Sequence, residues 1–115
     1  MIQQVYGARL LAVAAFAVAL AAPAYAQQQA PAGNAEAAKS KNSMCIGCHG
    51  IENYRTAYPE VYSVPKLGGQ SAAYIVKALQ EYRAGERSHP TMRGIAASLS
   101  DADMADLAAY YSEQK

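Results

Sequence analysis

Apolar positions along the chain fall into one uninterrupted run near its start and two periodic stretches in its second half. The run covers residues 10–22. From 72 to 82 and from 104 to 111, apolar side chains recur at spacings of three and four, which places them on one face of a helix. Ser71 and Ser100 can cap these helices, Asp103 can complete a capping box with Ser100, and Gly85 suits the left-handed position after a helix end. The pattern predicts a helix in each stretch.

The remainder of the chain has no sustained period. Asn34 can cap a helix that begins at Ala35 and runs to about Cys45, because its side-chain oxygen can accept from the free N–H groups of the first turn. Glycines and prolines interrupt residues 47–70 and again residues 86–94, so we expect two long irregular loops there. The predicted fold class is all-α, with three main helices, two long loops and no strand.

The uninterrupted apolar run and its flanks predict an export signal. Arg9 precedes the run, and an Ala-x-Ala site ends at Ala26. The run is shorter than the roughly 20 apolar residues that a membrane-spanning helix needs. We expect a cleaved signal over 1–26, a flexible leader over 27–33 and one domain over 34–115. The mature protein would then have no membrane span and would lie in the periplasm of a Gram-negative bacterium.

Composition and charge narrow the possible classes of function. A formal net charge of +1 excludes a strongly basic nucleic-acid binder and an acidic disordered tail. Two cysteines are too few for a scaffold held by several disulfides. Part of the 52% hydrophobic content belongs to the signal, so the domain has a modest core of its own. Domains of this size often gain stability from a metal, a cofactor or a disulfide. We expect a monomer.

The chemistry of the chain is concentrated in residues 45–49, which are Cys-Ile-Gly-Cys-His. This C-x-x-C-H spacing is typical of c-type haem attachment. Each thiol adds to one haem vinyl group, and His49 then falls beneath the ring as an iron ligand. Three other interpretations of the motif compete with haem attachment. A thioredoxin-like redox pair would need a βαβ context, which the sequence lacks. A zinc site would need His89 as its fourth ligand, and a plain disulfide is compatible with export. We expect one haem, held by Cys45 and Cys48.

A second axial ligand has two candidates in the loop at 86–94. Met92 follows His49 by 43 residues, enough chain to reach the opposite face of a haem. His89 is the rival, since Pro90 biases it toward an extended conformation. We favour Met92, because a thioether ligand raises the reduction potential of an electron-transfer haem. With both axial positions filled, no position is open for a substrate, and we expect no enzyme activity. Of the other methionines, Met1 belongs to the signal and Met44 adjoins Cys45, while Met104 lies on an apolar helix face, where we expect it to pack in the core.

Several sequence blocks resemble the small bacterial class I cytochromes c, related to the single-haem and double-haem high-potential periplasmic proteins. The similarity spans about 34–114, through blocks at 45–50, 65–70, 82–87, 92–96 and 99–103. It implies the class I cytochrome c fold, wrapped around one covalently bound haem. It also implies that the Pro65 carbonyl accepts a hydrogen bond from His49, and that Arg87 and Gln70 bond a haem propionate. The alternative for Arg87 is a solvated charge. We expect Tyr74 and Tyr110 in the core.

The resulting functional expectation is a periplasmic electron carrier in transient contact with redox partners such as an oxidase, a reductase or a dehydrogenase. Two alternatives stay open: a haem subunit of a larger dehydrogenase or sulfur-oxidising complex, and a gas-binding or peroxidatic protein with a vacant distal site. Charge is unevenly distributed, with five basic and two acidic side chains over 64–93 and one basic and four acidic over 94–115. This predicts a dipole whose basic middle segment faces an acidic partner surface.

Overall fold

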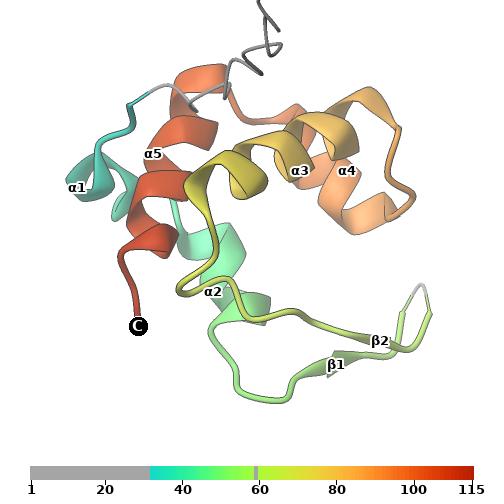
Figure 1. Cartoon of the computed structure of the whole chain (residues 1–115). Helices are drawn as coiled ribbons and strands as arrows, with labels where there is room; N and C mark the ends of the chain where they lie inside the picture. The colour runs from blue at the N-terminus through green and yellow to red at the C-terminus, as the bar shows by residue number, and fades with distance from the viewer. Residues whose placement is uncertain (1–31, 59) are drawn as a thin grey trace, which may run out of the picture.

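The computed structural model describes residues 32–58 and 60–115. The expected signal over 1–26 and most of the expected leader lie outside the described residues. Within that part of the chain there are five helices and one two-stranded ribbon: α1 Ala35–Ala38, α2 Ser43–His49, β1 Arg55–Thr56, β2 Tyr62–Ser63, α3 Ala72–Ala84, α4 Pro90–Ala97 and α5 Asp101–Ser112 (Figure 1). None of the described helices is long and apolar enough to cross a membrane.

The C-terminal helix α5 lies at the centre of the core. It packs against α1 and α3, and α3 in turn packs against α4 (Figure 1). Met104 and Leu107 of α5 are the largest fully buried side chains, and Ile75, Val76 and Leu79 of α3 are buried in the same cluster. These are the apolar faces that the periodicity predicts, so the two helical stretches are confirmed in both position and orientation.

The caps of α3 and α5 also follow the sequence. The Ser71 hydroxyl accepts from the backbone N–H of Tyr74 at 3.4 Å, and Gly85 ends α3 with φ of 83°. The backbone of a residue with a Cβ atom would be strained at this positive φ, whereas that of glycine is not. At the start of α5, Ser100 and Asp103 form the complete capping box. Each of these contacts is local, which is why sequence alone can predict it.

The prediction of one continuous first helix is wrong. Instead of one helix from residue 35 to 45, α1 ends at Ala38 and α2 begins at Ser43. The intervening turn is held to α5, because the Lys41 ammonium group pairs with Asp103 at 2.6 Å and Asp106 at 2.8 Å. These partners lie more than 60 residues away in the sequence, so no local pattern predicts the break.

The loop predictions are wrong at two places. Helix α4 occupies residues 90–97, where we expected irregular chain up to residue 94; Pro90 stands at its first position, where proline is favoured in helices. In the other loop, β1 and β2 pair antiparallel, with Thr56 opposite Tyr62. Strands of two residues are too short to produce an alternating pattern, so the expectation of no strand was also wrong.

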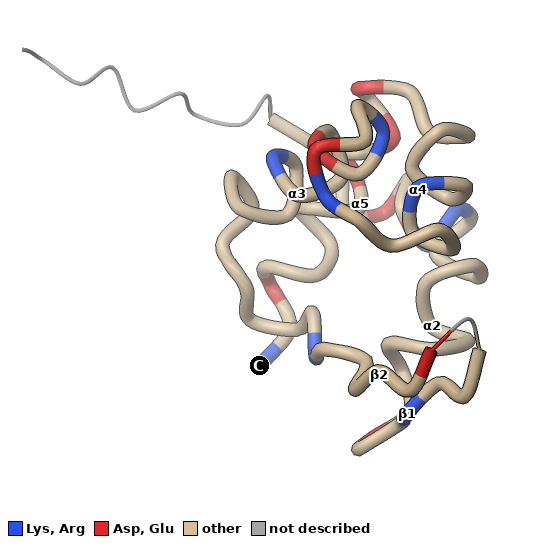
Figure 2. The backbone as a smooth tube through the Cα atoms, turned by 90° about the vertical axis from the view of Figure 1, so that its right-hand side faces the viewer, with Lys and Arg blue, Asp and Glu red and all other residues tan. Residues whose placement is uncertain are grey.

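The basic and acidic segments of the sequence come into contact in the folded structure. The basic middle segment and the acidic C-terminal segment meet where Arg83 of α3 pairs with Asp101 of α5 at 2.6 Å. Basic and acidic positions accordingly lie close together around α3 and α5 (Figure 2). At this point the charges of the two segments neutralise each other.

Candidate functional site

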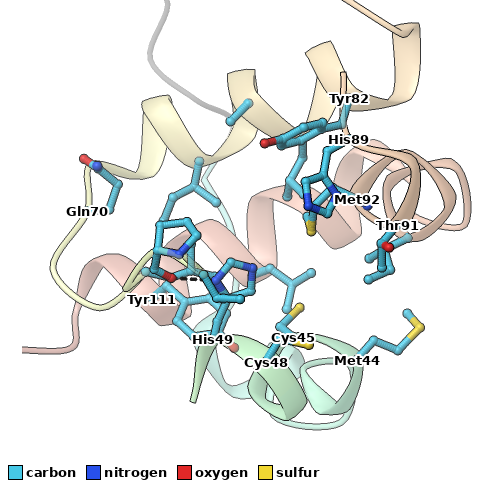
Figure 3. A pocket seen from close by; sticks show the side chains of 18 of the residues that line it. Met44, Cys45, Cys48, His49, Gln70, Tyr82, His89, Thr91, Met92 and Tyr111 are labelled. Carbon is cyan, nitrogen blue, oxygen red and sulfur yellow. Dashed lines mark hydrogen bonds between the residues drawn. The ribbon is translucent and has the colours of Figure 1, made fainter. Parts of the chain in front are cut away.

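One apolar cavity brings together all of the residues that the sequence predicts to bind a cofactor. Its volume is about 210 Å³, and α2, the loop over residues 64–70, α3, α4 and α5 all contribute to its wall (Figure 3). The predicted site residues that line it are Cys45, Cys48, His49, Pro65, Gln70, Arg87 and Met92, together with the rival ligand His89. Packing of helices distant in sequence creates this cavity.

Helix α2 presents both cysteines to the cavity. Residues three apart lie on the same face of a helix, so Cys45 and Cys48 stand side by side. Both are half-buried free thiols. Burial raises the pKa of the Cys45 thiol, against a smaller opposing effect of Tyr111. The buried Tyr111 hydroxyl has no hydrogen-bond partner among the described residues, and burial likewise raises its pKa.

The ring of His49, the last residue of α2, is oriented by the backbone of the following loop. Its Nδ1 lies 2.6 Å from the Pro65 carbonyl oxygen (Figure 3). A carbonyl can only accept, so Nδ1 is the protonated nitrogen and Nε2 keeps its lone pair. Metal-bound histidines are commonly oriented by such a bond, which leaves the other nitrogen available to the metal. This is the contact that the family resemblance implies for Pro65.

Met92 lies on α4, across the cavity from His49. Figure 3 shows its thioether sulfur directed into the space that the His49 ring and the two cysteines border from the other side. Met92 is partly buried and packs against the core. The expectation that Met92 lies in an irregular loop was wrong, because it occupies the first turn of helix α4, after the N-cap residue His89.

Arg87 stands at the edge of the cavity in a network of its own. Its Nε donates to Glu81 at 2.6 Å, and its guanidinium lies 5.4 Å from the Tyr74 ring and 5.6 Å from the Tyr82 ring. Glu81 raises the pKa of Arg87, whose charge in turn lowers the pKa of Glu81. Tyr74 is 48% exposed there, so the expectation of a core position was wrong: its hydroxyl is held by Arg87 at 3.4 Å.

Gln70 and Tyr110 are the remaining residues that the sequence places at the haem site or in the core. The Gln70 side-chain oxygen accepts from the backbone N–H of Ser71 at 2.8 Å, at the rim of the cavity. Tyr110 is partly buried and packs against the core, as expected. Sequence reasoning missed the contribution of Tyr82 to the same wall, and it considered His89 only as a ligand, not as the N-cap of α4. The signal for His89 was available, since a residue before a proline at the first helical position is a natural N-cap.

The donors around the cavity fit a covalently attached haem. Two thiols three residues apart lie on one helix, an imidazole with a free Nε2 stands beside them, and a thioether faces that imidazole. The side chains between these donors are largely apolar, as a porphyrin requires. Among the residues that the structure describes, no group of three or more His, Cys, Asp and Glu side chains is arranged to hold a metal ion.

Comparison with known proteins gives a consistent result. A family model described as cytochrome c matches residues 35–114. The chain is 41% identical to cytochrome c-554(548) of Halomonas halodenitrificans, over 73% of this chain and 100% of that protein. It is 38% identical to cytochrome c4 of Pseudomonas aeruginosa, over 73% of this chain and 40% of that protein. The chain therefore spans less than half the length of that cytochrome c4.

A solved structure is similar over the same region. Cytochrome c4 of Acidithiobacillus ferrooxidans superposes with a TM-score of 0.56 at 28% sequence identity. The match covers 71% of this chain and 50% of that one. The similarity thus concerns one half of the longer molecule.

Proposed function

Since this chain belongs to the cytochrome c family, we propose that it holds one haem through Cys45 and Cys48 and carries single electrons between redox proteins. Its class I cytochrome c fold agrees with the expectation from sequence. The observation that carries the proposal is the placement of His49 and Met92 on opposite walls of one apolar cavity. If both are axial ligands, no position is open for a substrate, and the protein is a carrier without enzyme activity.

The bound haem would supply the one-electron Fe(III)/Fe(II) couple. The chain's own residues hold and tune it. The thiols of α2 would form the two thioether links, and the Pro65 carbonyl holds the His49 ring in one orientation, which leaves Nε2 free to bind the iron. The buried side chains of α3 and α5, among them Leu79 and Leu107, exclude water from the cavity.

Arg87 and Gln70 are proposed to bond the haem propionates at the cavity rim. A guanidinium has five N–H donors. Glu81 and Tyr74 use Nε and Nη2 of Arg87, which leaves donors for an anion. For Gln70, the side-chain oxygen is occupied by Ser71, so its amide NH₂ is the group available to a propionate. Both residues line the cavity, which supports the assignment.

Export to the periplasm is part of the proposal. Residues 1–26 have the charge, apolar run and Ala-x-Ala site of a cleavable signal. We propose transient contact with other redox proteins, in keeping with a carrier that acts as a monomer.

Spectra of periplasmic extract test the proposal. We expect a haem that stays on the chain in denaturing gels, a low-spin reduced-minus-oxidised spectrum, and no rapid binding of carbon monoxide by the reduced protein. Replacing Cys45 and Cys48 together by serine removes the gel-stable haem. Rapid carbon monoxide binding would contradict the carrier assignment and favour the gas-binding alternative. Copurification with a large partner at equal stoichiometry would favour the alternative of a subunit in a larger complex.

A further inference from the structure

His89, the rival ligand in the sequence, has a different contact in the structure. Its side chain caps α4: Nδ1 accepts from the backbone N–H of Met92 at 3.3 Å. Met92 is the third residue of that helix, and its N–H is one of the four that no helical carbonyl can satisfy. Pro90 sets the backbone of the first position, so the cap and the proline together define the helix turn that carries Met92.

The direction of this hydrogen bond decides which histidine nitrogen is free. A backbone N–H can only donate, so Nδ1 of His89 is unprotonated and the proton of the neutral ring lies on Nε2. In that tautomer neither nitrogen offers a lone pair to a metal. His49 has the opposite arrangement, because its Nδ1 donates to Pro65 and Nε2 stays free. The capping contact therefore excludes His89 as an iron ligand while it lasts.

Two tyrosines hold the His89 ring in the capping orientation. The ring of Tyr62, on β2, meets it edge-to-face with centroids 5.3 Å apart, and Tyr82 of α3 does so at 6.4 Å. Both separations fall within the range of favourable aromatic pairs. Figure 3 shows His89 and Tyr82 together above Met92, on the same wall of the cavity. The ribbon β1–β2 thus contacts the residue that caps the Met92 helix.

We propose that His89 is a positioning residue for Met92: it caps the turn that presents the thioether, and Tyr62 of the β-ribbon holds the cap in place. The inference rests on the proposed role of Met92 as the distal ligand. Without the cap, the first turn of α4 frays, because the Met92 N–H must turn to water. The thioether then leaves the iron more often, although no contact to Met92's sulfur has been changed. The ribbon, distant in sequence, would thereby control the lifetime of the axial bond.

Three variants of the haem-loaded protein separate capping from other roles. His89→Leu removes the acceptor, His89→Asn keeps a strong N-cap acceptor without a ring, and Tyr62→Leu removes the aromatic contact while leaving His89 in place. Tyr62→Phe, which keeps the ring, is the matched control. The readouts are the rate of carbon monoxide binding by the reduced protein, the near-infrared sulfur-to-iron band of the ferric protein, and hydrogen exchange of the Met92 amide.

We expect His89→Leu to bind carbon monoxide roughly fivefold faster, the fold-change expected for a typical lost cap. Its Met92 amide should exchange faster by a similar factor, and its near-infrared band should disappear at a lower temperature. His89→Asn should restore most of all three properties. Tyr62→Leu should shift them in the same direction, and Tyr62→Phe should match the wild-type protein. This combination is specific to a cap, because a role in general stability gives no rescue by asparagine.

The possible failures are distinguishable. A folded His89→Leu protein with wild-type carbon monoxide binding and amide exchange would overturn the inference alone, and so would a His89→Asn protein as impaired as His89→Leu. If His89→Leu fails to fold, a Tyr62→Leu protein indistinguishable from Tyr62→Phe overturns it. A wild-type protein that lacks the near-infrared band and binds carbon monoxide at once would overturn the proposed function, and the inference with it.

Discussion

At the scale of single residues, the two histidines acquire different chemistry from one hydrogen bond each. His49 donates through Nδ1 to a carbonyl and keeps Nε2 for a metal, whereas His89 accepts through Nδ1 and keeps its proton on Nε2. The sequence names both as possible iron ligands, His49 through its motif and His89 as the rival of Met92. The partner atom decides between them, because a neutral imidazole has one donor and one acceptor nitrogen.

The identity of the distal ligand is tested at this scale. We expect Met92→Ala to lower the reduction potential sharply and to abolish the near-infrared sulfur-to-iron band of the ferric protein, because a thioether ligand stabilises the reduced iron. Potentiometry and the ferric spectrum measure both effects. Met104→Leu is the matched control, since Met104 is 0% exposed within the core and a swap of similar volume leaves the site alone. An unchanged spectrum in Met92→Ala would transfer the role to His89.

At the scale of elements, α5 is the helix on which the others depend. It contacts α1 and α3, and its apolar face contains the fully buried Met104 and Leu107. Its start is specified twice, because the Ser100 hydroxyl accepts from the Asp103 N–H at 3.1 Å and the Asp103 carboxylate accepts from the Ser100 N–H at 3.0 Å. Because these two bonds fix the first turn of α5, they also fix the surface on which α1 and α3 pack.

The capping box predicts a measurable loss of stability. Ser100→Ala leaves the Asp103 N–H without its side-chain acceptor, and we expect the free energy of unfolding to fall by about 1 kcal/mol. Denaturant unfolding of the haem-loaded protein measures this change. Ser112→Ala, at the other end of α5, removes a hydroxyl that bonds the Ala109 carbonyl, and we expect a change within about 0.5 kcal/mol. Equal losses in the two variants would contradict the capping argument.

At the scale of the whole molecule, one lysine connects the two ends of the domain. Lys41, in the turn between α1 and α2, pairs with Asp103 and Asp106 of α5. Asp106 also accepts from the Asn34 N–H at 2.7 Å, so the segment before α2 is attached to α5 at two points. These bonds hold α2, and with it the C-x-x-C-H segment, next to the C-terminal helix.

This network predicts how stability depends on pH. Lys41, followed by Ser100, holds the pKa of Asp103 well below its ordinary value, and Lys41, followed by Asn34, lowers the pKa of Asp106. A lowered folded-state pKa stabilises the protein fully above the unfolded value of about 3.9, and this stabilisation is lost as the pH falls through the folded value. We therefore expect the thermal unfolding midpoint of the wild-type protein to decrease as the pH is lowered below about 4.

A lysine substitution isolates the contribution of the network. Lys41→Met should reduce stability at neutral pH and make the loss on acidification smaller, because both carboxyl pKa values move toward their ordinary range. Lys39→Met is the control, since Lys39 pairs with the exposed Glu36 one turn away at 2.7 Å. Thermal unfolding at neutral pH and at about pH 3 makes the comparison. An acid dependence equal in wild type and Lys41→Met would refute the assignment.

Much of the site could be predicted from the sequence because its signals are local. The C-x-x-C-H segment, the apolar periods of α3 and α5, and the caps at Ser71 and Ser100 each depend on residues within one or two turns. Met92 became a candidate through its ligand chemistry and its distance of 43 residues from His49. The break between α1 and α2 could not be predicted, since it depends on the ion pairs of Lys41 with distant carboxylates.

The sequence by itself determined the two cysteines and the histidine that stand together on α2, the two long helices and the short list of candidate ligands. Only the tertiary structure decided which candidates face one another and which nitrogen of each histidine is free. It placed Met92 across from His49, paired Arg87 with Glu81, and assigned His89 to the cap of α4. The physical reason is that covalent spacing is a property of the chain, whereas hydrogen-bond partners and opposing cavity walls arise only when distant helices pack.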